Sequence, residues 1–304
     1  MKLIKMLSLL IGATISIIGA GLCEIYSIPV VPMLGSLIAG ILIPYLIPSI
    51  VDLSDTQDWK SSQRKLQRAG ILQKDTIIRI SFAYLFRIKI DDQYFLVQNS
   101  RTKKYQPVGG AYKFNKEEAE YLRDNIPVEN DNRIPVDKIT KCDYRLLIKN
   151  RYLRKFIKRF NKTPYRENIL NLSREFNEEI FLSGLLDKSA FGELAYSFVG
   201  RHMTRVEYGD VFKHYELLLA DIVEVQLSES QEQLFRNLMK TECSKYRFAN
   251  ADEIKSLGVR FTTDELSDDI ANHTPKILTE NAGKLIMRNK HKKPIKIQLE
   301  REYN

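Results

Sequence analysis

Three glutamates close together in the sequence are the residues best suited to chemistry. The segment Arg-Glu-Phe-Asn-Glu-Glu occupies positions 174–179. On an α-helix, Glu175, Glu178 and Glu179 fall on one face, where their like charges repel. A hard divalent cation such as Mg²⁺, which prefers oxygen ligands, is the usual partner for such a cluster. The segment therefore predicts a Mg²⁺ site with Arg174 orienting Glu178, and the alternative is an acidic, solvated helix face.

The elements that must position these glutamates alternate between strand and helix patterns. Runs rich in branched and aromatic residues predict strands over 76–90, 94–98, 106–113, 191–199 and 214–225. Apolar spacing and capping residues predict helices over 55–70, 115–125, 164–182 and 228–240. Strands and helices mixed in one continuous run indicate an α+β fold or an α/β/α sandwich.

A basic stretch at 141–162 precedes the glutamates and contains nine Lys or Arg residues against one acid. Aromatic residues are interleaved with the charges. A helix of this composition can bind a nucleotide, lie on anionic lipid, or rest on the protein core as a charged helix. In the first case, phosphates would be held by Arg154, Lys155, Lys158 and Arg159.

The overall charge points toward anionic partners. The 304 residues carry a formal net charge of +9, which suits nucleotides, nucleic acid or an anionic membrane surface, although a solvated basic surface is the alternative. The three cysteines, Cys23, Cys142 and Cys243, are far apart. This spacing excludes a disulfide framework and a CxxC metal site, and it is typical of a reducing compartment.

Two uncharged apolar runs, 6–22 and 28–51, begin the chain. The first run approaches, and the second exceeds, the roughly 20 residues that a helix needs to cross a bilayer. They predict a transmembrane hairpin over 1–52, and the alternative is a cleaved signal peptide whose basic start contains Lys2 and Lys5.

The charges that flank the predicted hairpin set its orientation. Lys2 and Lys5 precede the first run, Lys60 and Arg64 follow the second, and the connecting loop contains neither Lys nor Arg. Positive residues accumulate on the cytoplasmic side of a membrane. Both termini are therefore expected in the cytoplasm.

The glutamate segment resembles the second half of the Nudix box. Upstream, Gln-Pro-Val-Gly-Gly at 106–110 resembles the glycine pair that leads into that box, and residues 246–254 resemble the strand and acidic helix that end many Nudix domains. The resemblance covers about 74–280 and implies an α/β/α sandwich that binds nucleotides. It also implies that Gly109 and Gly110 lie at the nucleotide and that the glutamates bind Mg²⁺.

Three departures from the Nudix box put hydrolysis in doubt. Gly110 and Arg174 are separated by far more than the usual dozen residues. The glutamate of the first half-box is out of register, since Glu167 lies one position away. Phe181 stands where the box has a glycine. We therefore expect a nucleotide-binding fold that is not catalytic.

The order of segments is similar to that of the SMODS-associated NUDIX family. The expected organisation is a transmembrane hairpin (1–52), a linker helix (53–73), a Nudix-like domain (74–280) with a basic helical insertion (115–162), and a basic C-terminal tail (281–304). Members of this family act as membrane effectors in bacterial CBASS anti-phage defence.

The resemblance implies several partners and a location. A cyclic nucleotide second messenger activates the protein, which forms homo-oligomers, disrupts the bacterial inner membrane and causes abortive infection. No nucleic-acid polymer is expected as a partner. The alternatives are a membrane-tethered Nudix hydrolase that cleaves a nucleoside diphosphate derivative and a basic adaptor without ligand chemistry.

Overall fold

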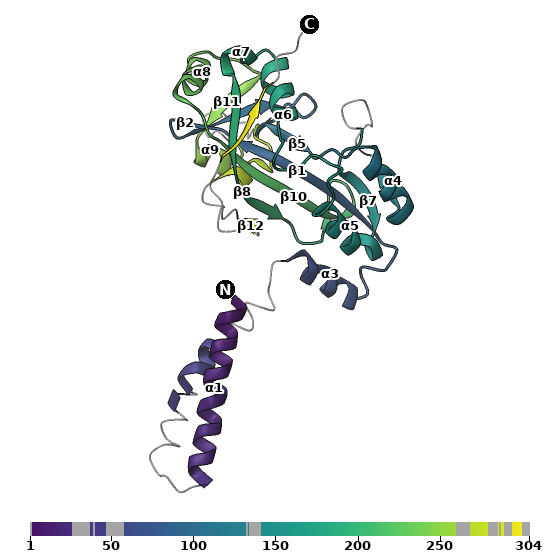
Figure 1. Cartoon of the computed structure of the whole chain (residues 1–304), viewed down its shortest axis with the longest axis vertical. Helices are drawn as coiled ribbons and strands as arrows, with labels where there is room; N and C mark the ends of the chain where they lie inside the picture. The colour runs from purple at the N-terminus through teal and green to yellow at the C-terminus, as the bar shows by residue number, and fades with distance from the viewer. Residues whose placement is uncertain are drawn as a thin grey trace. The chain divides into compact units, whose positions relative to one another are not determined.

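The computed structural model describes residues 2–25, 37–38, 40–46, 58–131, 133, 141–259, 268–278, 285, 287–288 and 294–299. The chain divides into two compact units, residues 1–68 and residues 69–304. Their helices and strands are labelled in Figure 1. Each unit is described separately below.

The first unit is helical. Helix α1 spans Lys2–Ile25, residues 40–46 are also helical, and α3 spans Trp59–Arg68. Within the described part of the chain, no helix combines the length and the apolar character that a membrane crossing requires.

This finding contradicts the predicted transmembrane hairpin over 1–52. It also contradicts the predicted location of the chain as a multi-pass protein of the bacterial inner membrane. The prediction required two long apolar helices. Within 28–51, which lies largely outside the described residues, the described helical segments are only 37–38 and 40–46, and these are shorter than the roughly 20 residues needed.

The second unit is built on a large mixed sheet with the strand order β12-β8-β10-β1-β7-β6. Its strands are β1 (Ile77–Arg87), β5 (Gly109–Ala111), β6 (Val128–Asn130), β7 (Arg145–Lys149), β8 (Glu193–Met203), β9 (Glu207–Gly209), β10 (His214–Val225), β12 (Met287–Arg288) and β13 (Ile295–Gln298). Strand β1 is central: it runs parallel to β10 and antiparallel to β5 and β7.

A smaller sheet packs against the large one. It contains β2 (Lys89–Ile90), β3 (Gln93–Gln98), β4 (Tyr105–Gln106) and β11 (Tyr246–Ala249). Leu85 of β1 and Ile222 of β10 form a buried cluster with Tyr94 and Leu96 of β3 and with Ile254. Apolar burial of this kind is the main force that holds two layers together.

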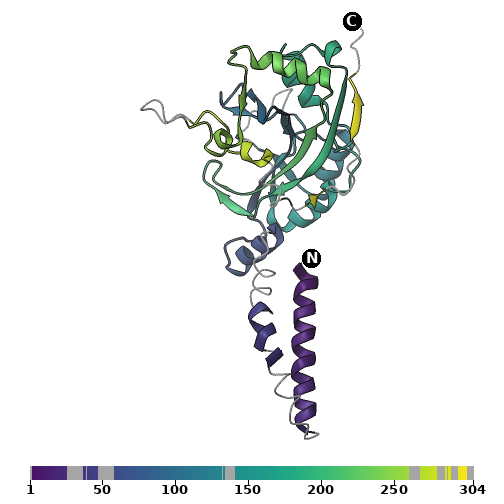
Figure 2. The same ribbon diagram turned by 90° about the vertical axis from the view of Figure 1, so that its left-hand side faces the viewer.

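Helices complete the unit. They are α4 (Lys116–Asn125), α5 (Leu153–Phe160), α6 (Arg174–Phe176), α7 (Lys188–Phe191), α8 (Glu229–Met239) and α9 (Ala251–Lys255). In Figures 1 and 2, α4 and α5 lie near β7, whereas α7 and α8 lie at the other end of the unit. Ring contacts join Phe160 of α5 to Phe82 of β1 and Phe176 of α6 to Phe86 of β1, with centroids 4.7 and 5.3 Å apart.

The two faces of β1 therefore have different neighbours, because successive side chains of a strand point to opposite sides. Phe82, Tyr84 and Phe86 face the helices. Ser81 and Leu85 face the other side. The mixed α/β fold predicted from the sequence is confirmed.

Three predicted elements differ from the structure. The basic stretch 141–162 contains a strand, β7, before its helix, α5. The helix predicted over 164–182 begins only at Arg174. The segment predicted only as a basic C-terminal tail contains a strand, β13, which pairs with β8. Each segment gains partners that are distant in sequence, and local patterns do not report these.

Candidate functional site

The glutamates lie on a short helix that changes its winding. The α-helical turn α6 is followed by a π-helix at Asn177–Leu182, in which each hydrogen bond spans five residues instead of four. Phe176 and Ile180 are fully buried and fix this helix against the sheet. Glu175, Glu178 and Glu179 are half-buried on its other side.

Arg174 lies among these carboxylates as an internal counter-ion. Its Nε donates to Glu167 Oε1 at 2.8 Å, and its Nη1 donates to Glu175 Oε1 at 2.6 Å. Nη1 also lies 3.6 Å from Glu178 Oε2, and Nη2 donates to the carbonyl oxygen of Ala111 at 2.9 Å. Glu167, which is out of register with the Nudix box in sequence, thus joins the cluster in space.

The glycine pair contacts the same glutamates. The Gly109 N–H donates to Glu179 Oε2 at 2.8 Å. A Cβ atom on Gly110 would lie only 1.8 Å from Glu175 Oε1. Gly109 and Gly110 therefore lie directly beside Glu179 and Glu175 in the structure.

Burial changes the acidity of two of the glutamates. It raises the pKa of Glu179 to about 8, and the nearby Glu175 charge contributes in the same direction. Burial also raises the pKa of Glu175, although Arg174 opposes this effect. Glu179 is therefore mostly protonated at pH 7.

The residues as arranged do not fit a Mg²⁺ ion. Carboxylate oxygens are suitable ligands in principle, but Glu175 is bound to Arg174 and Glu179 to the Gly109 backbone. Among the described residues, no three Asp, Glu, His or Cys side chains converge on a possible metal position. The predicted metal site at Glu175, Glu178 and Glu179 is thus not confirmed.

A pocket of about 590 Å³ opens on the opposite face of β1. Ser81, Ala83 and Leu85 form its floor, whereas Glu175 lies beside Gly110 on the Tyr84 side of the sheet. The floor continues onto β10 through Leu218 and Ala220. The glutamates and this basic pocket, as we call it below, therefore lie on different faces of one sheet.

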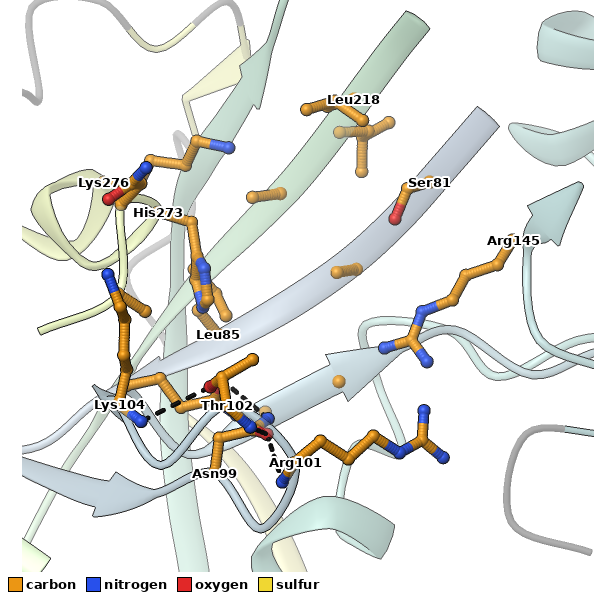
Figure 3. A pocket seen from close by; sticks show the side chains of 18 of the residues that line it. Ser81, Leu85, Asn99, Arg101, Thr102, Lys104, Arg145, Leu218, His273 and Lys276 are labelled. Atoms are coloured by element: carbon orange, nitrogen blue, oxygen red, sulfur yellow. Dashed lines mark hydrogen bonds between the residues drawn. The ribbon is translucent and has the colours of Figure 1, made fainter. Parts of the chain in front are cut away.

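Side chains of basic residues surround the pocket. Six basic residues line it, namely Arg79, Arg101, Lys104, Arg145, His273 and Lys276. None of the described residues that line it is Asp or Glu. Figure 3 shows His273 and Lys276 on one side of the pocket and Arg101 and Arg145 on the other.

Some of these cations are already paired. Arg79 is bound to Asp131 and Glu216, Arg145 donates to Asp143 Oδ2 at 3.2 Å, and Lys104 Nζ lies 2.7 Å from Asp268 Oδ2. These carboxylates are not among the residues that line the pocket, but each offsets part of the charge of the cation that it binds.

His273 and Lys276 carry the clearest electrostatic signature of the basic pocket. Burial lowers the pKa of the Lys276 ammonium. Burial, the charge of Lys276 and the charge of Arg145 lower the pKa of His273 to about 4, so the imidazole is neutral at pH 7. The Lys276 shift comes from burial alone, whereas the His273 shift also includes repulsion from Lys276 and Arg145, which a bound anion would offset.

The basic residues predicted to bind phosphates lie elsewhere. Arg154, Lys155, Lys158 and Arg159 all belong to α5, and none of them is among the residues that line the basic pocket. Arg159 donates to both oxygens of Glu118, whose side chain is fully buried. Lys155 donates to the carbonyl oxygen of Asn125. Of the predicted nucleotide-binding set, Gly109 and Gly110 line the pocket.

Local sequence patterns do not indicate the basic residues of the pocket, because these residues come from four distant segments. One local signal is Ser-Arg-Thr-Lys-Lys at 100–104, a basic turn shortly after β3. Arg79 is a second possible signal, since an arginine within an apolar strand requires a buried partner.

Comparison with known proteins identifies the family of this chain. A NUDIX-family hydrolase of known crystal structure from Clostridium perfringens aligns with 67% of this chain and 96% of its own, at 12% identity and a TM-score of 0.22. No curated protein matches the sequence. The family model for the SMODS-associated NUDIX domain matches residues 77–278, more than half of the chain, and the chain therefore belongs to this family.

Proposed function

We propose that this chain is the nucleotide-sensing component of a CBASS anti-phage defence system. Its Nudix-like domain binds a cyclic nucleotide second messenger in the basic pocket, and binding leads to abortive infection. Family membership supports the link to CBASS. The pocket supports the choice of an anionic ligand.

One observation carries the ligand assignment. The basic pocket combines six basic residues with an apolar floor and has no acidic residue in its described lining. Nucleotides require both features, because their phosphates pair with cations and their bases pack on apolar surface. The pocket volume also falls within the range of small-molecule sites.

The helical segment that carries the glutamates, 174–182, which we call the glutamate helix, supports nucleotide sensing over nucleotide hydrolysis. A ligand in the basic pocket lies across β1 from Glu175, and Glu179 is engaged by the Gly109 backbone. Neither carboxylate reaches into the pocket lining. The bound nucleotide is therefore retained intact.

The test is a binding measurement with a matched pair of charge reversals. The full chain is titrated with cyclic di-AMP, cyclic di-GMP and 3′,3′-cyclic GMP-AMP. Arg101→Glu in the pocket is expected to raise Kd at least tenfold, since reversing a charge beside a phosphate removes a charge-assisted bond and adds repulsion. Lys158→Glu on the exposed side of α5 is expected to change Kd less than twofold.

Two outcomes would overturn the proposal. The first is that no cyclic nucleotide binds. The second is that the two reversals weaken binding equally, which would return the site to α5. Light scattering with and without ligand tests the expected self-association, and a single-stranded RNA titration tests the expected lack of polymer binding.

The hydrolase alternative is examined in the same preparation. The full chain is incubated with ADP-ribose and Mg²⁺, and AMP release is measured. Release that is lost in Glu178→Gln would favour a Nudix hydrolase instead.

A further inference from the structure

Phe212 contributes an aromatic ring to the basic pocket. The described residues that line the pocket include no tyrosine, no tryptophan and no second phenylalanine. Phe212 lies in the loop between β9 and β10 and is half-buried. Aromatic side chains are the usual platforms on which nucleobases stack. Within the described lining, Phe212 is therefore the ring best suited to hold a base.

The hairpin of β9 and β10 fixes the position of Phe212. The two strands are antiparallel neighbours. The Lys213 N–H donates to the carbonyl oxygen of Gly209 at 2.8 Å and closes the short loop 210–213. From outside the hairpin, Arg133 Nη1 donates to the carbonyl oxygen of Val211 at 3.4 Å. The backbone on both sides of Phe212 is thus tied down.

Arg79 supports the ring from behind. Its guanidinium carbon lies 3.6 Å from the centre of the Phe212 ring, which is a stacked cation–π contact. Arg79 is itself fixed, because Nε donates to Asp131 Oδ2 at 2.5 Å and Nη1 donates to Glu216 Oε1 at 3.2 Å. Glu216 has room for this only because position 209 is glycine: a Cβ on Gly209 would lie 2.4 Å from Glu216 Cδ. One face of the ring is therefore covered by a fixed guanidinium, and the remaining ring surface borders the pocket.

The arginines at this end of the pocket are already bound to carboxylates. Asp131 and Glu216 share the single guanidinium of Arg79, so a phosphate placed there would meet two carboxylates as well as one cation. Arg145, the other arginine at this end, is likewise bound to Asp143. This end of the pocket thus favours an uncharged, flat group over a phosphate.

The opposite end of the pocket has the opposite preference. The floor follows β1 from Arg79 to Leu85, which is roughly 20 Å of extended strand. The segment 268–278, which contributes two basic residues to the lining, approaches β1 beyond Leu85, where Arg87 Nη1 donates to the carbonyl oxygen of Ile277 at 3.4 Å. The pocket therefore has an aromatic end and a basic end along one strand.

We propose that Phe212 is the base-stacking residue of the basic pocket: a nucleobase lies on the ring surface that Arg79 leaves open, and the phosphates lie toward the segment 268–278. This inference rests on the proposed function and assigns a residue to the base. Phe212 contacts the ligand, whereas Arg79 acts only through Phe212 and is a positioning residue. Every base has a π-face, so the stack adds affinity without choosing among bases.

The affinity test uses a matched pair of substitutions in the full chain. Calorimetric titrations use cyclic di-AMP, cyclic di-GMP and 3′,3′-cyclic GMP-AMP. Phe212→Leu keeps an apolar side chain but loses the flat ring, and it is expected to raise the Kd of the tightest ligand fivefold or more. Val211→Leu alters the neighbouring residue, which is 82% exposed and outside the pocket lining, and it should change Kd less than twofold. An unchanged Kd in Phe212→Leu would overturn the inference.

The spectroscopic test reports stacking itself. Phe212→Trp keeps an aromatic platform and is expected to bind within threefold of wild type, while the stacked base quenches the fluorescence of the introduced indole. The wild-type chain, whose single tryptophan is Trp59, gives the background signal. Val211→Trp is the control and should not be quenched. Equal quenching in the two variants would contradict the inference, and this readout stands even if melting temperatures show that Phe212→Leu is not folded.

The positioning role of Arg79 is tested in two backgrounds. Arg79→Lys keeps a positive charge for Asp131 and Glu216 but lacks the planar guanidinium. It is expected to raise Kd threefold or more in the wild-type background and to have no further effect in Phe212→Leu, because its action passes through the ring. Additive losses in the double variant would show that Arg79 does not act through Phe212.

The outcomes separate this inference from the proposed function. If none of the three nucleotides binds to the wild-type chain, the proposed function fails. If one binds and Arg101→Glu weakens it, but Phe212→Leu keeps its affinity and the indole at position 212 is not quenched, the proposed function stands and the stacking inference is wrong.

Discussion

The two faces of the large sheet differ in how the charges on them are balanced. On the Tyr84 face, buried charges are satisfied from within, because Arg174 binds Glu167 and Glu175 and the Gly109 backbone binds Glu179. On the Ser81 face, the basic pocket gathers cations around an apolar floor with no carboxylate in its described lining. The comparison teaches that a family motif can serve the fold, while the ligand site that we propose lies across the sheet.

If the internal charges are structural, removing one partner must cost stability. The strongest case is Arg159, which is bound to the fully buried Glu118 together with Thr163 Oγ1. Arg159→Ala is expected to lower the free energy of unfolding by about 3–5 kcal/mol, since a buried carboxylate is left without its counter-ion. Urea denaturation measures this change. The exposed neighbour Lys158→Ala should stay within about 0.5 kcal/mol of wild type, and equal effects would contradict the structural role.

Arg174 and Arg101 offer the direct contrast between the two faces. Arg174→Met is expected to destabilise the protein by about 3 kcal/mol, because Glu167 and Glu175 lose their shared partner. Arg101→Met, at an exposed pocket position, is expected to cost less than about 1 kcal/mol while reducing nucleotide affinity. Chemical denaturation and titration of both variants provide the comparison. The contrast between the two faces is contradicted if Arg174→Met leaves the free energy of unfolding unchanged.

Alanine substitutions at Gly109 and Gly110 are expected to lower the stability of the protein by different amounts. A Cβ on Gly109 would lie 2.2 Å from the Tyr84 carbonyl oxygen, at a φ of +149°, and backbone atoms cannot move aside easily. Gly109→Ala is therefore expected to cost about 2–3 kcal/mol. A Cβ on Gly110 meets the Glu175 side chain instead, which can shift, so Gly110→Ala should cost less. Thermal unfolding checks the order, and a larger loss for Gly110→Ala would refute it.

The smallest expected effect is the contribution of Glu179 to the pH dependence of the free energy of unfolding. Its pKa in the folded protein is about 8, above the usual value of 4.5. The folded state thus holds an extra proton between these values, and stability is full below pH 4.5 and falls as the pH rises toward 8. The expected slope is at most about 1.4 kcal/mol per pH unit. Glu179→Gln should flatten this dependence in unfolding curves, and an unchanged slope would show that Glu179 is ionised in the fold.

The sequence predicted the local elements better than the site. Strands β1, β3 and β10 and helices α4 and α8 lie close to their predicted ranges, since their apolar spacing and caps are local signals. Strand β7 was missed because its alternating burial lies within a basic stretch that reads as helix. The transmembrane hairpin was predicted from apolar composition alone.

Contacts between distant residues explain why the basic pocket was not predicted. Arg79, Arg145 and Lys276 meet only because β1, β7 and the segment 268–278 converge on one sheet face. The basic residues of α5 gave a stronger local signal. Arg159, however, is occupied by Glu118, which lies 41 positions away. Charge density in a sequence does not reveal which charges the fold itself uses.

The location of a bound cyclic nucleotide tests the central claim most directly. A crystal structure of the full chain with the cyclic nucleotide that binds most tightly is expected to place its phosphates among the basic residues of the pocket, over the floor of Ala83 and Leu85. No hydrogen bond is expected between the bound nucleotide and Glu175 or Glu178. A ligand found instead on the Tyr84 face, with its phosphates beside Glu178 and a metal ion, would contradict the account and restore the glutamate helix as the functional site.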